Sequence, residues 1–515
     1  MADAAVAPAL TKRQLYTVFG GVVAGLFLSA LDTNIINVAL PTIVGDLGGL
    51  NQIAWVGTAY LLTSTAATPL FGKLSDLYGR RLLFQIAIVT FVVGSLLCGL
   101  AQNMPQLVLA RGIQGIGGGG LFAMSFTIIG DVVPPRERGR YVGIITSVFA
   151  VASVAGPLLG GFLVDHSSWR WIFMINVPLG IVAMVVTTTA LRLPFQRQQR
   201  SVDYWGATLL VGSVTTLILM TTWAGEGKYA WGSLTTIGLG LLSLLLAVAF
   251  VFWEMRGSEP IVPMRLFRNR TVALFVPMMV CIGTIMFGAT AFLPLYLQAV
   301  DGVSATESGL LLLPLMVGVM VSSITSGRIT TRTGHYKLWP VIGTTIATAG
   351  VFMLSFLGGD SSRSYISLAM LLIGLGFGMV MPTSTLAVQN SVEWKDLGVA
   401  TSLVTFFRSL GGAVGLAVAG ALFNSRMISS GVPEQLLQTP QAIKDLPLEE
   451  QQSVIAALAD AIGFIFVVFT PVMVVSMVLS VFLKELPLRS SSSIQPGRSE
   501  EAGDTPDVSA VASAH

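Results

Sequence analysis

Long apolar runs alternate with short polar segments along the whole chain. Fourteen of these runs are about 20 residues long, which is the length of an α-helix that crosses the hydrocarbon core of a bilayer. They lie near residues 15–40, 52–72, 82–101, 106–130, 141–164, 169–191, 205–223, 233–254, 271–297, 305–326, 338–358, 365–387, 398–423 and 458–483. The pattern predicts an all-α polytopic membrane protein with 14 transmembrane helices.

Composition supports this fold class and argues against several kinds of function. Only 11% of the 515 residues are charged, against about 25% in a typical soluble domain, and the mean hydropathy is +0.77. The spans leave loops too short for a soluble catalytic domain, and these loops offer no nucleophile, base and oxyanion arrangement, so we do not expect an enzyme. The net charge of +3 is small and scattered, which argues against a nucleic-acid partner.

Cysteine and histidine give no sign of a metal site. Cys98 and Cys281 each lie inside an apolar run and are predicted to be core residues, without a disulfide. His166, His335 and His515 fall in loops or the tail and share no ligand spacing. We therefore expect no bound metal and no cofactor.

Basic residues are concentrated on one side of the predicted spans. Of the 29 Lys and Arg residues, 22 fall on the side of the two termini, five on the opposite side and two within spans. Because cytoplasmic loops are enriched in Lys and Arg, both termini are predicted to be cytoplasmic. The first run is too long for a signal peptide and is predicted to be an uncleaved span in the cell (inner or plasma) membrane. Residues 1–14 and the Ser-rich residues 487–515 are predicted to be cytoplasmic tails, the second disordered.

Two loops carry the same local pattern. Residues 72–79 and 327–334 both read Gly, basic, aliphatic, hydroxyl, with a second Gly seven positions after the first. This repeat predicts two six-helix halves, residues 15–191 and 271–484, with two inserted linker helices at 205–254. A substrate site is then expected between the halves, near the middle of the membrane. Such a duplication favours a transporter over a channel or a membrane enzyme.

Three charged residues stand out inside the predicted spans: Asp32, Arg111 and Arg408. Each costs about 2.5 to 3.5 kcal/mol at a helix centre on insertion scales, so it needs a function or a partner. At 1.5 Å per residue, Asp32 and Arg111 lie about 12 Å and about 7.5 Å from the outer end of their spans. The two can neutralise each other, either as a static buried pair or as a pair that breaks when Asp32 takes up a proton.

Arg408 lies near mid-membrane with no obvious acidic partner in the sequence. Two roles remain open for it: binding of backbone carbonyls at a helix break, or binding of an anionic part of a substrate. Tyr60, Gln114 and Gln298 are the other candidates for the lining of an adaptable substrate cavity. Because Asp32 is the one acid clearly inside a span, neutral or monovalent amphiphiles are the expected substrates.

Glycine clusters occur inside two predicted spans. Residues 111–120 contain a GxGxxG string, but no βαβ unit surrounds it, so we interpret these glycines as a smooth face for helix packing and not as a dinucleotide loop. Gly156, Gly160 and Gly161 favour close packing in the same way, and Pro157 adds a kink.

Five segments together resemble a known family. They are residues 31–41 (LDTNIINVALP), 72–81 (GKLSDLYGRR), 111–115 (RGIQG), 156–161 (GPLLGG) and 169–178 (WRWIFMINVP). In this order they resemble the major facilitator superfamily, and within it the fourteen-span drug:proton antiporters of the EmrB/QacA type. The resemblance implies proton-coupled export of amphipathic organic compounds by alternating access, with protons as the coupling ion.

The resemblance also implies roles for particular residues. Gly156, Pro157, Gly160 and Gly161 would form the antiporter motif that seals the interface between the halves. Asp32 and Arg111, by their charge and depth in the spans, are our candidates for proton coupling. The implied conformational latch is a cytoplasmic charge cluster that forms in one access state and breaks in the other. Its members would be Gly72, Asp76, Gly79, Arg80, Arg81, Asp131 and Arg140.

Two other functions remain open at this stage. The first is a dedicated exporter of one metabolite, lipid or siderophore, and the second is a membrane sensor that binds a ligand without moving it. In each case the partners are a small amphipathic molecule and membrane lipid, and the sequence leaves a periplasmic adaptor partner undecided.

Overall fold

The computed structural model describes residues 12–132, 138–190, 203–225, 228–257, 260, 262, 264–393, 397–433 and 447–487. Throughout these residues the regular structure is helical, with no strand. Ten helices in the described part are long and apolar enough to cross a membrane, and three shorter apolar helices lie at Val151–His166, Trp205–Thr221 and Leu338–Leu354. The chain is therefore a multi-pass membrane protein.

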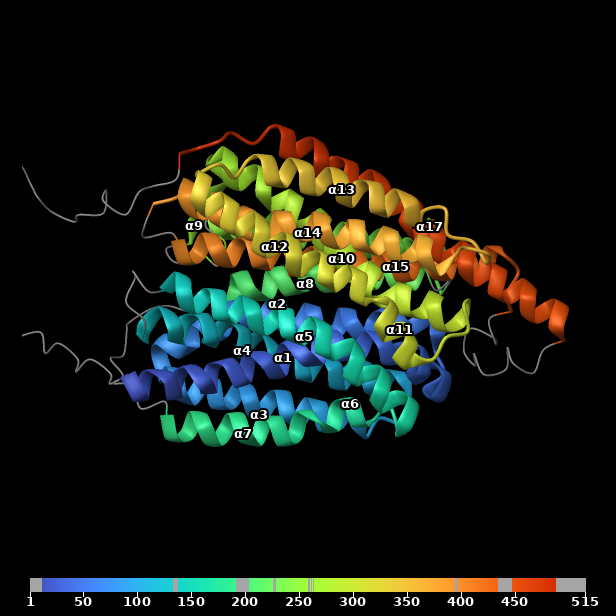
Figure 1. Cartoon of the computed structure of the whole chain (residues 1–515), viewed down its shortest axis with the longest axis horizontal. Helices are drawn as coiled ribbons and strands as arrows, with labels where there is room; N and C mark the ends of the chain where they lie inside the picture. Colours follow the sequence, from blue (N-terminus) through green and yellow to red (C-terminus); the bar gives the residue numbers. More distant parts are fainter. Residues whose placement is uncertain are drawn as a thin grey trace, which may run out of the picture.

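The helices form two bundles that lie side by side (Figure 1). The N-terminal bundle consists of α1 (Lys12–Leu47), η1 (Leu50–Gln52), α2 (Ile53–Tyr78), α3 (Arg80–Gly99), α4 (Met104–Val132), α5 (Arg138–His166), α6 (Trp171–Met174) and α7 (Asn176–Ala190). The C-terminal bundle consists of η2 (Met264–Arg268), α10 (Arg270–Ala299), α11 (Ala305–Leu311), α12 (Leu313–Thr333), α13 (Leu338–Leu354), α14 (Arg363–Ser391), α15 (Leu397–Ser429) and α17 (Leu448–Val481). Between them in the chain come α8 (Tyr204–Gly225) and α9 (Leu234–Arg256), which pack on each other.

The same set of helix neighbours occurs in both bundles. In the N-terminal bundle α4 packs on α2 and α3, while α1 packs on α5 and α7. In the C-terminal bundle α14 packs on α12 and α13, while α10 packs on α15 and α17. Helix α8 contacts α2 of one bundle and α15 of the other, so it lies along the seam between them.

Glycines of α4 allow three helices to approach closely. A side-chain carbon on Gly115 or Gly119 would collide with the backbone of α2 at Tyr60 and Ser64, and one on Gly117 would collide with Phe91 on α3. Without a hydrophobic driving force in lipid, such close backbone contact is a main source of helix association. The glycine string at 111–120 is thus part of a packed helix, as its membrane setting indicates.

Several predicted boundaries need correction. The signature segment 72–81 is mostly helix: α2 continues to Tyr78, Gly72 lies inside it, and Gly79 alone makes the turn with a φ of 94°. The expectation of a loop over residues 72–79 is therefore wrong for all but Gly79. Helix α17 begins at Leu448, ten residues before the predicted run, because the polar segment that precedes the run continues the same helix. The predicted tails lie almost entirely outside the described residues, and α1 already begins at Lys12.

The two bundles meet at the end of the molecule away from the chain termini, on the right of Figure 1. We call this the far end. Here both carboxylate oxygens of Asp165 on α5 accept hydrogen bonds from the first turn of α11, at 3.2 Å from the Ala305 nitrogen and 2.8 Å from the Thr306 nitrogen. Gln298 on α10 donates to the Val38 carbonyl on α1 at 2.8 Å. The far end is closed by contacts that join one bundle to the other.

Small residues bring α5 and α11 close enough for these bonds. A Cβ on Gly161 would lie 2.5 Å from the Thr306 Cα, and a Cβ on Gly309 would lie 2.5 Å from the Pro157 carbonyl oxygen. Gly156 and Gly160 face the opposite way, toward Asn34 and Ile35 of α1. The segment 156–161 therefore packs within its own bundle and across the interface; its sealing role in transport stays a prediction.

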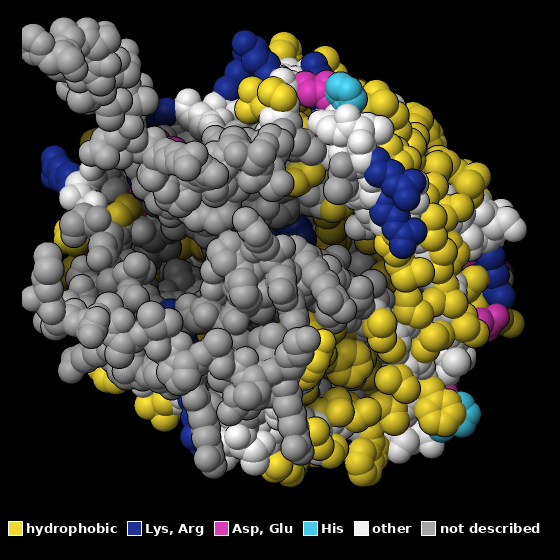
Figure 2. All heavy atoms as spheres, turned by 60° about the vertical axis from the view of Figure 1, so that its left-hand side comes forward, with side chains coloured by type: hydrophobic (Ala, Val, Ile, Leu, Met, Phe, Trp, Pro, Cys, Tyr) yellow, Lys and Arg dark blue, Asp and Glu magenta, His cyan; other side chains and the backbone are white. Residues whose placement is uncertain are grey.

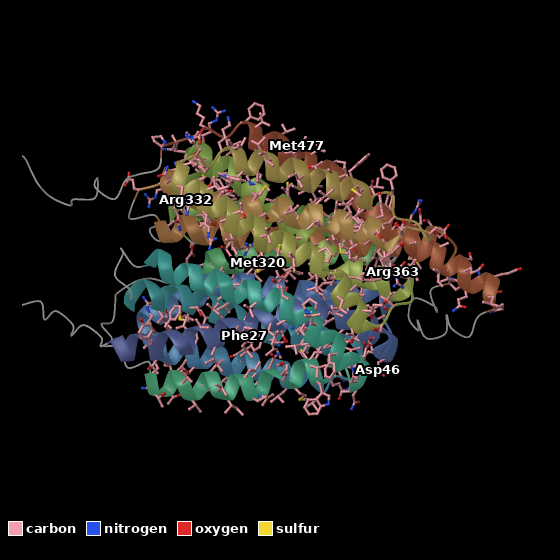
Figure 3. The ribbon with its side chains drawn as sticks, viewed as in Figure 1. Phe27, Asp46, Met320, Arg332, Arg363 and Met477 are labelled. Carbon is pink, nitrogen blue, oxygen red and sulfur yellow. The ribbon has the colours of Figure 1, made fainter. Side chains whose placement is uncertain are left out.

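Charged side chains lie at the ends of the bundles and apolar ones cover the flank. Figure 2 shows Lys and Arg side chains around the end that carries the termini, with hydrophobic side chains over the described flank beside it. In Figure 3, Arg332 lies toward this end, while Asp46 and Arg363 lie toward the far end. The most exposed large apolar residues include several of α9, such as Leu234 and Leu245, as expected for a helix that faces lipid.

Loss of the Asp165 carboxylate should loosen the first turn of α11. Replacing a capping side chain by Ala costs about 0.5 to 2 kcal/mol, so local opening should become about 2- to 30-fold more populated in Asp165→Ala. Hydrogen exchange at residues 305–308 measures this directly. Asp165→Asn, which keeps one of the two acceptor oxygens, is the graded control and should exchange at a rate between those of the parent and the Ala variant. Equal exchange in the Ala variant and the parent would show that the cap is unimportant.

Candidate functional site

A buried ion pair lies in the core of the N-terminal bundle. Asp32 on α1 and Arg111 on α4 contact each other, with 2.6 Å between Oδ2 and Nη1. Both side chains are only 1% exposed. The structure thus brings together the two charges that the sequence placed at similar depths in the membrane.

Arg111 makes two further hydrogen bonds within the bundle. Its Nη1 donates to the Gln114 Oε1 at 2.7 Å, and its Nε donates to the Val56 carbonyl at 3.3 Å. The guanidinium also lies over the Tyr60 ring, 4.3 Å from the ring centroid, in a cation–π arrangement. Three helices therefore hold the cation in place: α1, α2 and α4.

Asp32 accepts hydrogen bonds on both carboxylate oxygens. Besides Arg111, its Oδ1 accepts from the Gln114 Nε2 at 2.8 Å and from the Asn176 Nδ2 at 2.8 Å. Asn176 also donates to the Ser95 hydroxyl at 3.0 Å, and Ser95 donates to the Phe173 carbonyl at 2.8 Å. We call Asp32, Arg111, Gln114, Asn176 and Ser95 the buried network.

Two members of the buried network were missed by sequence reasoning. Asn176 lies at the first position of α7, inside the segment 169–178 that carries part of the family resemblance, and Ser95 lies on α3. The one feature of the sequence that could have indicated Asn176 is its polar amide within an otherwise apolar run. Without the fold, nothing in the sequence indicates that Asn176 points at Asp32.

The bonding of the network depends on the charge of Asp32. A carboxylate accepts from three donors here, whereas a protonated Asp32 would donate one bond and lose the charge that holds Arg111. Leaving one partner of a buried pair uncompensated costs about 3 to 5 kcal/mol, so Arg111 would then need another partner or water. The arrangement is therefore suited to link a proton to a movement of Arg111.

A small cavity lies directly against this network, between the bundles. Tyr60 and Arg111 form part of its wall on the N-terminal side, and Phe287 and Ala291 of α10 with Leu416 of α15 form the opposite wall. The Tyr60 hydroxyl is 3.0 Å from the Ser29 hydroxyl, which holds the ring in place. One residue, Arg111, thus belongs both to the ion pair and to the cavity.

The other candidate residues occupy different places. Gln114 is fully buried behind Arg111, so it belongs to the network and does not line this cavity. Gln298 takes part in the far-end contacts described above. Arg408 lies in the first half of α15 and contacts the Met381 sulfur on α14 at 3.8 Å.

The predicted cytoplasmic latch is only partly described. Arg80, at the start of α3, donates to the Ser75 hydroxyl, and Arg81 beside it is partly buried. The side chains of Asp76, Asp131 and Arg140 lie outside the described part of the structure. The latch therefore stays a prediction.

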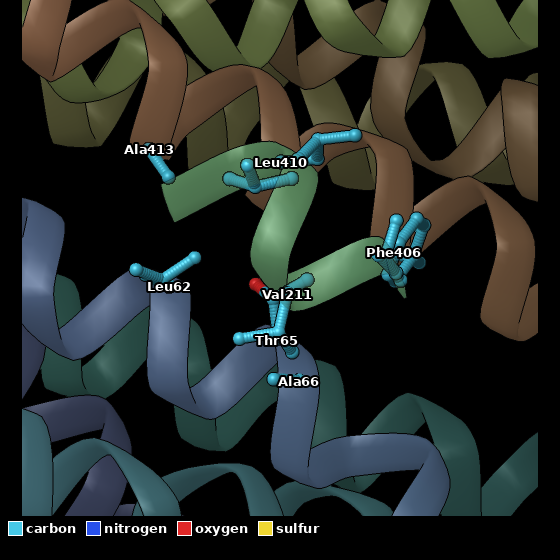
Figure 4. A pocket seen from close by; sticks show the side chains of 9 residues that line it. Leu62, Thr65, Ala66, Val211, Phe406, Leu410 and Ala413 are labelled. Carbon is cyan, nitrogen blue, oxygen red and sulfur yellow. The ribbon is translucent and has the colours of Figure 1, made fainter. Parts of the chain in front are cut away.

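A second, apolar cavity lies at the seam beside the inserted helices (Figure 4). It is small and is lined by three helices. Leu62, Thr65 and Ala66 come from α2, Leu210, Val211 and Val214 from α8, and Phe406, Leu410 and Ala413 from α15. No group of three or more His, Cys, Asp or Glu side chains that could hold a metal ion occurs among the described residues.

Comparisons with known proteins agree with this architecture. The family model described as Major Facilitator Superfamily matches residues 22–416. The chain is 36% identical to Multidrug transporter protein MdtP of Bacillus subtilis, over 96% of this chain and 97% of that protein, and 33% identical to Efflux pump FUS6 of Gibberella fujikuroi, over 98% and 95%. A bacterial homolog of the human lysosomal transporter Spinster, solved in an inward-facing and unoccupied conformation, has the same fold, with a TM-score of 0.66 at 16% identity over 92% of this chain and 97% of that one. The chain is accordingly a transporter and not an enzyme, and it belongs to the major facilitator superfamily.

Proposed function

We propose that this protein is a proton-coupled multidrug efflux transporter that exports amphipathic organic compounds across the cell membrane by alternating access. The observation that carries the proposal is the position of Arg111, which is bonded to Asp32 and also forms part of the wall of the cavity between the bundles. A proton on Asp32 would release Arg111 and so change the cavity. Relatives named as a multidrug transporter and as an efflux pump support the same class of activity.

The fourteen-span subtype is part of this proposal. The ten long apolar helices and the three shorter ones account for thirteen of the proposed spans. Helix α2, which packs against α4 in the N-terminal bundle, is the fourteenth. The repeated set of helix neighbours supports two related six-helix halves, with α8 and α9 as the inserted pair. We place both termini in the cytoplasm on the strength of the Lys and Arg distribution.

The far-end contacts fit one state of an alternating-access cycle. Asp165 and Gln298 join the bundles on the side that would face outward, so this conformation would open toward the cytoplasm. Export then requires these contacts to break while the cytoplasmic side closes. The latch residues Asp76, Arg80, Arg81, Asp131 and Arg140 are our candidates for closure on that side.

A dedicated exporter of one metabolite is the second candidate. One relative, 34% identical over 84% of this chain and 79% of its own length, is named as an acurin A biosynthesis cluster transporter of Aspergillus aculeatus. Uptake of a panel of unrelated amphiphiles into everted vesicles separates the two functions. Transport of several compounds supports multidrug efflux, and transport of one compound alone would favour the dedicated exporter.

Asp32→Asn should abolish uphill export driven by a proton gradient. The amide keeps the shape and several hydrogen bonds of the carboxylate but removes the titrating group, so substrate binding should survive. Accumulation in everted vesicles with an imposed pH difference is the measurement. Asp46→Asn is the matched control, because Asp46 lies on the same helix but is 48% exposed at its far end. If Asp32→Asn vesicles still concentrate substrate, proton coupling lies elsewhere.

Cysteine labelling tests the proposed orientation. Thr333→Cys and Asp360→Cys place thiols at exposed sites on opposite ends of the C-terminal bundle, and the native Cys98 and Cys281 are buried. An impermeant thiol reagent added to intact cells should label position 360 at once and position 333 only after permeabilisation. The reverse pattern would place the termini outside.

A further inference from the structure

Arg408 lies on a part of α15 that protein surrounds on all sides. From Leu403 to Asn424 no residue is exposed, because α2, α8, α10 and α17 pack around this helix. A side-chain carbon on Gly283 of α10 would collide with the Arg408 carbonyl, so the backbone of α15 is held tightly there. Arg408 is therefore an internal residue of the C-terminal bundle and does not reach lipid.

The Arg408 guanidinium has almost no hydrogen-bonding partner. Its contact in the described structure is the Met381 sulfur at 3.8 Å, and a thioether is a weak acceptor. Among the described residues no carboxylate lies within 4.0 Å of it. Arg111, by contrast, binds a carboxylate, an amide oxygen and a carbonyl. A guanidinium has five N–H donors in a fixed fork, and those of Arg408 are left for another molecule.

Arg408 lies in a partly exposed stretch of α15. Residues 405–410 are each partly exposed, and they lie between the buried Leu403 and Val404 on one side and the buried Gly411 and Gly412 on the other. Phe406 and Leu410 of this stretch line the apolar cavity at the seam, so the stretch borders space inside the protein. Phe407 and Met381, both partly buried, supply apolar surface beside the cation.

The charges inside the membrane do not balance. Asp32 neutralises Arg111, and the other buried acid, Glu254, lies in the last turn of α9, outside the two bundles. Arg408 therefore leaves one positive charge without a counterpart in the described bundle interior. An arginine in that setting is costly, and such residues commonly line a ligand pathway. A guanidinium beside apolar and aromatic surface is suited to bind an amphipathic molecule with a carboxylate-like head group and an apolar body.

We propose that Arg408 binds the anionic head group of the transported molecule, and that the preferred substrates are amphipathic monoanions. This inference rests on the proposed export function and names its substrate class. It predicts that a carboxylate is bound more tightly than a neutral or cationic molecule of the same shape.

Three fluorescent probes that share the same apolar part and differ only in the head group test this preference. They are 11-(dansylamino)undecanoate, its methyl ester and the corresponding trimethylammonium compound. Binding is measured by dansyl fluorescence with the full chain in nanodiscs of phosphatidylcholine. The wild type should bind the carboxylate at least about tenfold more tightly than the ester, and the cation most weakly. Equal affinity for the three probes would overturn the proposal.

Variants at Arg408 assign the preference to this residue. Arg408→Gln should lose about tenfold or more in affinity for the carboxylate and leave the ester unchanged, which also shows that the variant is folded. Arg408→Lys should keep a reduced preference for the carboxylate, because it keeps the charge but not the fork. Arg426→Gln is the matched control, since Arg426 lies on the same helix but pairs with Asp460 at 2.6 Å. An unchanged carboxylate affinity in Arg408→Gln would overturn the assignment.

Two further experiments identify the source of the anion and distinguish failure of the Arg408 proposal from failure of the proposed export function. If phosphatidylglycerol in the nanodisc competes with the carboxylate probe in the wild type and not in Arg408→Gln, the anion is a lipid head group; otherwise it is a soluble molecule. In everted vesicles, Arg408→Gln should still export the ester when a pH difference is imposed. Failure of the wild type to export any of the probes would contradict the export function. Export of all three probes by the wild type without a preference for the carboxylate would contradict only the role of Arg408.

Discussion

The ion pair between Asp32 and Arg111 sets the arrangement of the N-terminal bundle. A charge in lipid without a partner is costly, so both side chains must face the bundle interior, and their remaining bonds must be satisfied there. Gln114, Asn176 and Ser95 provide these bonds from α4, α7 and α3. The glycines of α4 let α2 and α3 approach closely enough to enclose the pair. Packing and electrostatics therefore depend on each other at this site.

The two bundles treat buried charge differently. The N-terminal bundle encloses a cation with a carboxylate and several amide and carbonyl groups, so its charge is neutral within the protein. The C-terminal bundle repeats the helix neighbours but keeps Arg408 beside a sulfur. This asymmetry is consistent with different roles for the two halves in the proposed cycle. The N-terminal half would bind the proton, and the C-terminal half would bind the head group of the substrate.

Much of this architecture could be predicted from the sequence, because apolar length and intramembrane charge are local properties. The depths of Asp32 and Arg111 followed from counting residues along their spans, and the structure pairs them. Asn176 could not be found in this way, since the residue that a side-chain amide bonds depends on how the helices are arranged, which the sequence of its own helix does not specify. The turn after α2 was misplaced at Gly72 for a related reason: glycine permits a reversal, but helix packing decides whether one occurs.

The closed far end must be stable enough to exist and weak enough to open. Its described polar contacts are few: the Asp165 cap on α11 and the Gln298 bond to Val38, with glycine contacts between them. A net hydrogen bond contributes about 0.5 to 1.5 kcal/mol, so this closure amounts to only a few kcal/mol. Binding of a proton and a substrate can supply a difference of that size between two states. The interior of each bundle is held by close backbone contact, and that of the N-terminal bundle also by the ion pair. Both would cost far more to disrupt, so the expected movement is of one bundle against the other.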